Sequence, residues 1–146
     1  MSWWTYVVGS VVVDTFTYKE SEDSVKKYLE SLPETSGSEG GCEYHVSILD
    51  GTNVSGYING KSMDYQTKYS ISIVGCLRDT HAKTVREELL NILKTIYVDK
   101  WDIEMCSIYI HDNTHSIHFT KGYCGNKLTY VTEEDGKQSK EIIELE

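Results

Sequence analysis

Two short stretches of the sequence place a histidine two residues before a hydroxyl side chain: His45 with Ser47 in EYHVSILD, and His118 with Thr120 in SIHFTKG. In a β-strand, positions i and i+2 point to the same face, so each pair is presented together. If the two strands lie near each other, one imidazole can take a proton from an attacking oxygen while the other gives one to the leaving oxygen. The hydroxyls can then hold phosphoryl oxygens as charge develops. These residue types suit a phosphodiester cleavage site that needs no metal.

The two motifs resemble those of the two-histidine (2H) phosphoesterase superfamily, in which paired His-x-Ser/Thr motifs have apolar neighbours. Tyr44–Ile48 follows that pattern, and Ile117–Thr120 follows it up to Lys121, where an apolar residue is usual. The resemblance implies a cyclic or oligonucleotide substrate and four catalytic residues: His45, Ser47, His118 and Thr120. That superfamily has two lobes with their own helices, whereas this sequence predicts one helix between the motifs. The alternative is that both histidines are ordinary strand residues at a solvated sheet edge.

The other histidines near the second motif raise the question of a metal site. His111, His115 and His118 lie close to Asp112 in the sequence. Their spacing mixes even and odd offsets, so on strands they cannot all share one face. The spacing also fits neither a helical nor a zinc-finger pattern. The sequence therefore predicts no metal and no cofactor.

The first part of the chain predicts a strand, a helix and a loop. Residues 3–16 are rich in Trp, Tyr and Val, which favours a strand, with a bulge expected at Gly9. Ser21 is placed to cap a helix with acidic residues in its first turn, and Pro33 ends that helix. The composition of 35–41 is typical of a loop.

The second part predicts further strands and a longer helix. Alternation predicts strands over 43–49 and 68–77, with a long, mobile hairpin loop over 52–66 between them. A helix follows, capped by Asp79 or Thr80. Its apolar stripe consists of Val85, Leu89, Ile92, Leu93 and Ile96. The remaining predicted elements are strands over 103–111 and 115–120, joined by an Asp112-Asn113 turn, and a terminal hairpin with a turn at Asp135-Gly136.

This order, β-α-β-β-α-β with a β tail, predicts a single α+β domain spanning 1–146. The simplest packing is a ferredoxin-like sandwich over 3–120, with four antiparallel strands and both helices on one face of the sheet. The segment 121–146 forms a C-terminal β extension. The other face of the sheet is left open, and His45 and the serines of strands 43–49 and 68–77 are predicted to point there.

Charge limits the classes of partner. The chain has 14 basic and 23 acidic residues, a net charge of −9, and no basic run. Direct nucleic-acid binding is therefore not expected, because it depends on clustered Lys and Arg. An acidic surface suits a basic protein partner, and the alternative is that the charge only maintains solubility.

The N-terminal stretch MSWWTYVVGSVVVDTF lacks the charged region and cleavage site of a signal peptide, and its apolar run is too short to span a bilayer. A cytoplasmic protein without membrane contact is expected. The four cysteines are widely spaced with no C-x-x-C motif, which favours reduced thiols.

The stretches SWWTYVVGSVVVDTF and LPETSGSEGG, and more loosely residues 75–94, resemble a group of small proteins encoded by phages and prophages of low-GC bacteria. The resemblance implies a role against host defence, such as anti-CRISPR-like inhibition, in the host cytoplasm. We therefore expect non-catalytic inhibition of a basic host protein or defence complex. A nucleotide ligand belongs to the phosphodiesterase alternative, and a virion component is a third class.

Seven residues are predicted to contact the partner, because exposed aromatic and acidic side chains suit an inhibitor of a basic surface. They are Trp3, Trp4, Tyr57, Tyr65, Glu133, Glu134 and Asp135. For Trp3 and Trp4 the alternative is packing in the core and over a sheet edge, since adjacent strand residues face opposite ways. The exposed edge of the terminal hairpin could also pair two copies into a homodimer.

Overall fold

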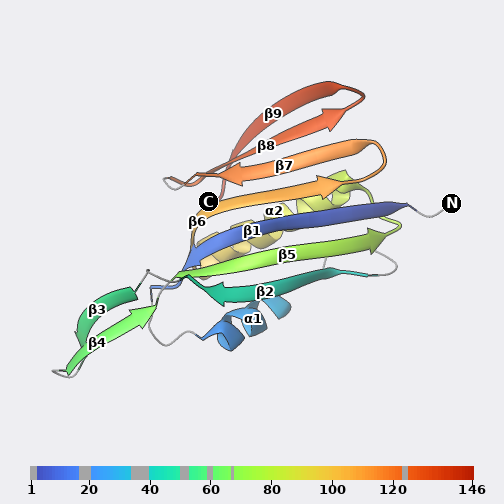
Figure 1. The fold of residues 1–146 in the computed structure, drawn as a ribbon. Coiled ribbons are helices and arrows are strands. Elements are labelled where there is room, and N and C mark those ends of the chain that lie inside the picture. The colour runs from blue at the N-terminus through green and yellow to red at the C-terminus, as the bar shows by residue number, and fades with distance from the viewer. Residues whose placement is uncertain are drawn as a thin grey trace.

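The computed structural model describes residues 3–16, 21–33, 40–49, 53–58, 61–66, 68–122 and 125–146 (Figure 1). Predictions for the remaining residues, including most of the predicted loop 35–41, lie outside the described residues. The elements are β1 (Trp4–Asp14), α1 (Glu22–Glu30), β2 (Cys42–Ile48), β3 (Asn53–Ile58), β4 (Lys61–Gln66), β5 (Lys68–Arg78), α2 (Ala82–Asp99), β6 (Asp102–His111), β7 (His115–Lys121), β8 (Lys127–Glu134) and β9 (Lys137–Glu144).

The described strands form an antiparallel seven-stranded sheet in the order β2-β5-β1-β6-β7-β8-β9, and β3 and β4 pair separately (Figure 1). The mixed α+β class is confirmed. The sheet is larger than the predicted four strands, because β7, β8 and β9 continue it beyond β6. The C-terminal segment is continuous with the rest of the sheet, and its residues Leu128, Tyr130 and Leu145 belong to the same core cluster.

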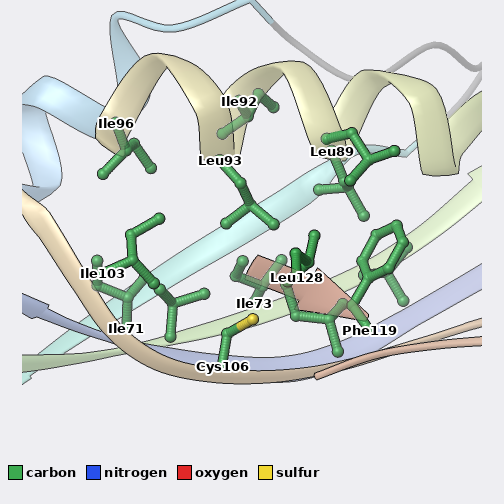
Figure 2. Packing of buried hydrophobic residues seen from close by; sticks show 14 of the residues in the cluster. Ile71, Ile73, Leu89, Ile92, Leu93, Ile96, Ile103, Cys106, Phe119 and Leu128 are labelled. Atoms are coloured by element: carbon green, nitrogen blue, oxygen red, sulfur yellow. The ribbon is translucent and has the colours of Figure 1, made fainter. Parts of the chain in front are cut away.

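One face of the sheet is covered by the helices. Alternate strand residues, such as Ile71, Ile103 and Phe119, pack beneath α2, as Figure 2 shows. The predicted stripe of α2, Val85 to Ile96, is buried there. Val25 and Leu29 bury the apolar side of α1 in the same cluster. Because side chains alternate along a strand, the intervening residues must occupy the opposite, helix-free face. We call this the open face.

The predicted start of α1 is confirmed. Ser21 accepts a hydrogen bond from the backbone of Ser24 at 3.1 Å, and the Ser24 hydroxyl accepts one from the backbone of Ser21 at 3.0 Å. This reciprocal pair satisfies two N–H groups that the first helical turn leaves without partners. The helix ends at Glu30, three residues before Pro33.

The predicted cap of α2 is wrong. Neither Asp79 nor Thr80 caps it, and the N-cap residue is His81, whose side chain makes no capping hydrogen bond. The carboxylate of Asp112, in the turn between β6 and β7, instead accepts a hydrogen bond from the backbone N–H of Ala82 at 2.9 Å. Asp79 has a left-handed backbone (φ 59°) and its N–H donates to the Trp3 carbonyl, so it belongs to the preceding turn.

Two smaller predictions are also corrected. Residues 53–58 and 61–66 are paired strands of a hairpin, not a long loop. The bulge expected at Gly9 lies elsewhere, because the register between β1 and β6 shifts between Val12 and Val13. A glycine is still needed at position 9, since a Cβ there would lie 2.5 Å from the Cα of Ile108 on β6.

Candidate functional site

Side chains on the open face form rows that run across the strands, because directly paired residues on neighbouring strands lie side by side. One row begins at His45 on the edge strand β2 and continues with hydroxyl residues on the next five strands. This hydroxyl row consists of Ser72, Ser10, Ser107, Thr120 and Thr129. The sequence prediction that His45 and the serines of strands 43–49 and 68–77 face away from the helices is confirmed, since His45, Ser47 and Ser72 are all exposed.

Beside the hydroxyl row lies an apolar strip. Val8 on β1 pairs with Val74 on β5 and with Tyr109 on β6, and Tyr6 lies one row further along β1. We define Tyr6, Val8, Val74 and Tyr109 as the apolar strip. Each remains between 42% and 55% exposed although it lies in the middle of the sheet. Contiguous exposed apolar side chains on a soluble protein mark a contact surface.

Acidic side chains flank this strip on both sides. Glu43 on β2 lies opposite Val74, and Glu133 on β8 lies two strands from His111, which pairs with Tyr6. Both carboxylates are exposed. The open face therefore has an exposed carboxylate on each side of an exposed apolar strip.

His118 sits at the border between the apolar strip and the hydroxyl row. Its ring lies flat against Tyr109, with centroids 3.8 Å apart and planes 7° apart. Its Nε2 atom is 2.9 Å from the hydroxyl oxygen of Ser107. Burial lowers the pKa of His118 below its ordinary value, because the charged imidazolium loses hydration there. The ring is therefore neutral at neutral pH.

The two histidine motifs share a face but not a site. His45 is on β2 and His118 on β7, with β5, β1 and β6 between them. Neighbouring strands are roughly 4.8 Å apart, so these four steps separate the two imidazoles by about 19 Å. A single phosphodiester group cannot contact both. Ser47 accompanies His45, and Thr120 accompanies the distant His118, so the four residues form two separate pairs.

The Ser107–His118 pair was not anticipated from the sequence, because no local spacing signals it. A serine beside a neutral imidazole has the residue types of a nucleophile and its base. Such a pair is catalytic when a third group orients the imidazole and hydrogen-bond donors are positioned to stabilise an oxyanion. In the described part of the chain, the partners of His118 are Ser107 and Tyr109, neither of which is a carboxylate. The arrangement supports a fixed, neutral side chain at a contact surface.

The tryptophans lie on opposite sides at the start of β1. The Trp3 ring packs on His81 beside the start of α2, with centroids 4.5 Å apart. Trp4 pairs with Arg78, whose guanidinium carbon is 6.0 Å from the centre of the indole ring. Both are half-buried. The opposite orientation was predicted, and neither ring belongs to the main core cluster.

The acidic residues of the terminal hairpin differ in whether they make contacts within the chain or are exposed. Glu134 makes contacts within the chain, with its carboxylate 3.6 Å from Nζ of Lys83 and 3.1 Å from Nε2 of His115. Glu133 and Asp135 are exposed, and Asp135 begins the predicted turn to β9. Tyr57 and Tyr65 belong to β3 and β4, and their side chains lie outside what the structure describes.

The three histidines considered for a metal are split between the faces. His111 and His118 are on the open face, where both rings lie nearly parallel to the ring of Tyr109. His115 lies against the buried carboxylate of Asp112, 3.3 Å away. Among the described residues, no group of His, Cys, Asp and Glu side chains is arranged to hold a metal ion.

A cavity of about 480 Å³ lies between α1 and β2. Leu29, Lys26 and Tyr44 are among its lining residues. Burial, followed by the nearby Cys42, raises the pKa of Tyr44 to about 12, so its phenol stays protonated. The lining therefore offers a hydroxyl donor and a lysine, together with Glu43 and His45, whose Nε2 atom lies 3.5 Å from a Glu43 carboxylate oxygen.

Comparisons of the chain with protein-family models, with curated proteins and with solved structures found no match. Neither described helix has the length and apolar character needed to cross a membrane.

Proposed function

We propose that this protein acts without catalysis, by binding a basic protein partner through the open face of its sheet and covering that partner's surface. The observation that carries the proposal is the apolar strip of Tyr6, Val8, Val74 and Tyr109, exposed on adjacent strands β5, β1 and β6. Burying such a strip against another protein provides a hydrophobic driving force, and aromatic residues are enriched at the centres of interfaces.

Charge supports the choice of a basic partner. Glu43 and Glu133 lie on either side of the apolar strip, and the whole chain has a net charge of −9. Opposite charge on the partner speeds encounter and sets orientation, while the apolar centre limits dissociation. The resemblance to small phage and prophage proteins leads us to propose a component of a bacterial defence system as that partner.

The framework of this surface is best described as a ferredoxin-like unit with an extension. The strand order β2-β5-β1-β6, with a helix between β1 and β2 and another between β5 and β6, supports that proposal. Strands β7 to β9 then widen the open face beyond the four-stranded unit. The wider sheet places His118, Thr129 and Glu133 beside the apolar strip.

A matched pair of valine variants tests the proposal. Val8 in the strip and Val98 on α2 are similarly exposed, at 54% and 61%. Tagged wild type, Val8→Lys and Val98→Lys are each used to capture proteins from a bacterium carrying defence systems. We expect one basic protein to be retained by wild type and Val98→Lys, to be depleted at least tenfold with Val8→Lys, and to elute at high salt.

A second readout connects binding to inhibition. Expression of wild type or Val98→Lys in a host with the captured defence system should restore infection by a phage that the system normally blocks, and Val8→Lys should not. Equal capture by Val8→Lys, or inhibition unaffected by that change, would contradict the proposal. Circular dichroism of the three purified proteins checks that each is folded.

A further inference from the structure

The strand β9 leaves an accessible edge at one end of the sheet. It pairs with β8 in an unbroken register from Lys127–Glu144 to Glu134–Lys137, and its other side has no neighbouring strand among the described residues (Figure 1). All its residues except Ile143 are exposed. Unpaired backbone groups on such an edge are a template for a further strand.

The opposite edge of the sheet differs. There α1 lies against β2, and the carboxylate of Glu22 accepts a hydrogen bond from the backbone N–H of Ile48 at 3.3 Å. A helix and a side chain thus cover part of that edge, which is a usual protection against strand pairing. The β9 edge strand instead carries a large apolar side chain that is accessible, since Ile142 is 59% exposed.

We propose that two copies of this chain pair antiparallel through β9, about a two-fold axis at Ile142. The β9 residues that point to the open face are self-complementary in that register. Ile142 faces Ile142 of the second copy, and Lys140 faces Glu144 of the second copy, twice by symmetry. Apolar and opposite-charge pairs directly across strands are the contacts that stabilise antiparallel pairing.

Neighbouring registers are less favourable. In an antiparallel pair, directly opposite residues point to the same face of the sheet. With a two-fold axis, the numbers of two opposite residues are therefore both even or both odd, and the axis lies between the two copies of one residue. An axis at Lys140 places two lysines opposite each other, and an axis at Glu141 or Glu144 places two glutamates opposite each other. An axis at Ile143 aligns Lys140 with Glu146, but it places Ile142 opposite Glu144 and Glu141 opposite Leu145. An axis at Ile142 aligns apolar residues and opposite charges and leaves one such mismatch, Glu141 opposite Ile143.

The pairing has a geometric consequence for the open face. A two-fold axis between antiparallel strands is perpendicular to the sheet, so both open faces point to the same side of one continuous sheet. The dimer then presents two apolar strips together, which increases avidity for a partner with two matching surfaces. The proposed pairing of two copies through β9 does not depend on what the apolar strips bind.

Charge reversal tests the register directly. Lys140→Glu alone places Glu opposite Glu, and Glu144→Lys alone places Lys opposite Lys. We expect sedimentation velocity to show a concentration-dependent dimer for wild type. The dissociation constant of the dimer should be at least tenfold higher for each variant. An equimolar mixture of the two variants restores both opposite-charge pairs and should recover the dimer. Lys137→Glu, outside the paired stretch, is the matched control and should dimerise like wild type.

A cross-link keeps the proposal testable if a charge variant fails to fold. In a Cys76→Ser background, Ile142→Cys places two thiols opposite each other at the axis, with Cβ atoms about 5 Å apart, and should oxidise to a covalent dimer. Gln138→Cys in the same background faces Glu146 and should cross-link at least tenfold more slowly. A monomeric wild type at all soluble concentrations, no dimer in the variant mixture, or equal cross-linking at 138 and 142 overturns the proposal.

Discussion

The carboxylate of Asp112 caps a helix that begins 30 residues earlier in the chain, because it accepts the backbone N–H of Ala82 at 2.9 Å. The same carboxylate accepts backbone hydrogen bonds from Thr114 at 2.8 Å and from His115 at 2.7 Å. One buried side chain therefore fixes both the β6–β7 turn and the start of α2. This joins the helix layer to the part of the sheet that carries the candidate contact surface.

Replacing Asp112 by Ala should lower the free energy of unfolding by about 2–4 kcal/mol, since three backbone N–H groups lose a charged acceptor. Chemical denaturation followed by circular dichroism measures the change. Asn113→Ala in the same turn is the control, because Asn113 is exposed, and it should change stability by less than about 0.5 kcal/mol. Equal stability of the Asp112 variant and wild type would show that the cap contributes nothing.

The same carboxylate should make stability depend on pH. Burial raises the pKa of Asp112, but backbone hydrogen bonds from Ala82, Thr114 and His115 lower it more, so the folded pKa lies below the ordinary value. The folded state then binds fewer protons than the unfolded state. The contribution of Asp112 to the free energy of unfolding is complete above the unfolded pKa of about 3.9, and it is lost as pH falls through the folded pKa. Urea midpoints between about pH 6 and pH 3 should therefore fall more steeply for wild type than for Asp112→Asn.

Local patterns predicted the faces of the elements well. The alternation of Tyr44 and Val46 with His45 and Ser47 correctly divided most of β2 between the core and the open face. Ile48, at the end of the strand, was expected on the core side but is 38% exposed. The helical stripe of α2 was also found, because burial imposes a period on the sequence. Both results follow from single elements and need no knowledge of neighbours.

Contacts between distant strands were not predictable in this way. The apolar strip exists because Val8 pairs with Tyr109, and the site of His118 exists because Tyr109 lies directly across from it and Ser107 lies diagonally within hydrogen-bond distance. Such pairs depend on strand order and register, which one sequence does not specify locally. For the same reason the sequence could not show that β2 and β7 are four strands apart, which separates His45 from His118.

Gly9 should be essential for the close approach of β1 and β6. A Cβ at this position would meet the Ser107 carbonyl and the Cα of Ile108, both backbone atoms. We expect Gly9→Ala to lower the free energy of unfolding by about 1–3 kcal/mol, because the strands must separate. Gly122→Ala is the control, since nothing lies within 4 Å of a Cβ there. Thermal denaturation of both variants measures the difference, and equal melting temperatures would contradict this account of Gly9.

The open face can be monitored through Cys76, an exposed thiol opposite Tyr6. In a Cys42→Ser, Cys124→Ser background, a maleimide should label Cys76 rapidly. Cys106 should stay unlabelled, because it is buried and burial raises its pKa to about 11. Bound partner should slow Cys76 labelling at least tenfold, as read by mass spectrometry. Unchanged labelling in a saturated complex would place the partner on another surface.

His118 should reduce stability when it becomes protonated. Burial against Tyr109 keeps its folded pKa below the ordinary 6.5, so the folded state binds fewer protons than the unfolded state. Stability then rises with pH through this range and falls as pH drops below about 6.5.

The comparison of wild type with His118→Gln isolates this contribution, since the other four histidines are present in both proteins. Between about pH 7.5 and pH 5, the urea midpoint should fall more for wild type than for the variant. Ser107→Ala keeps the imidazole against Tyr109 but removes its hydroxyl partner at 2.9 Å. It should therefore retain the pH dependence and lower stability by about 1 kcal/mol at all pH values. Parallel profiles for wild type and His118→Gln would mean that His118 is as well solvated in the folded chain as in the unfolded chain.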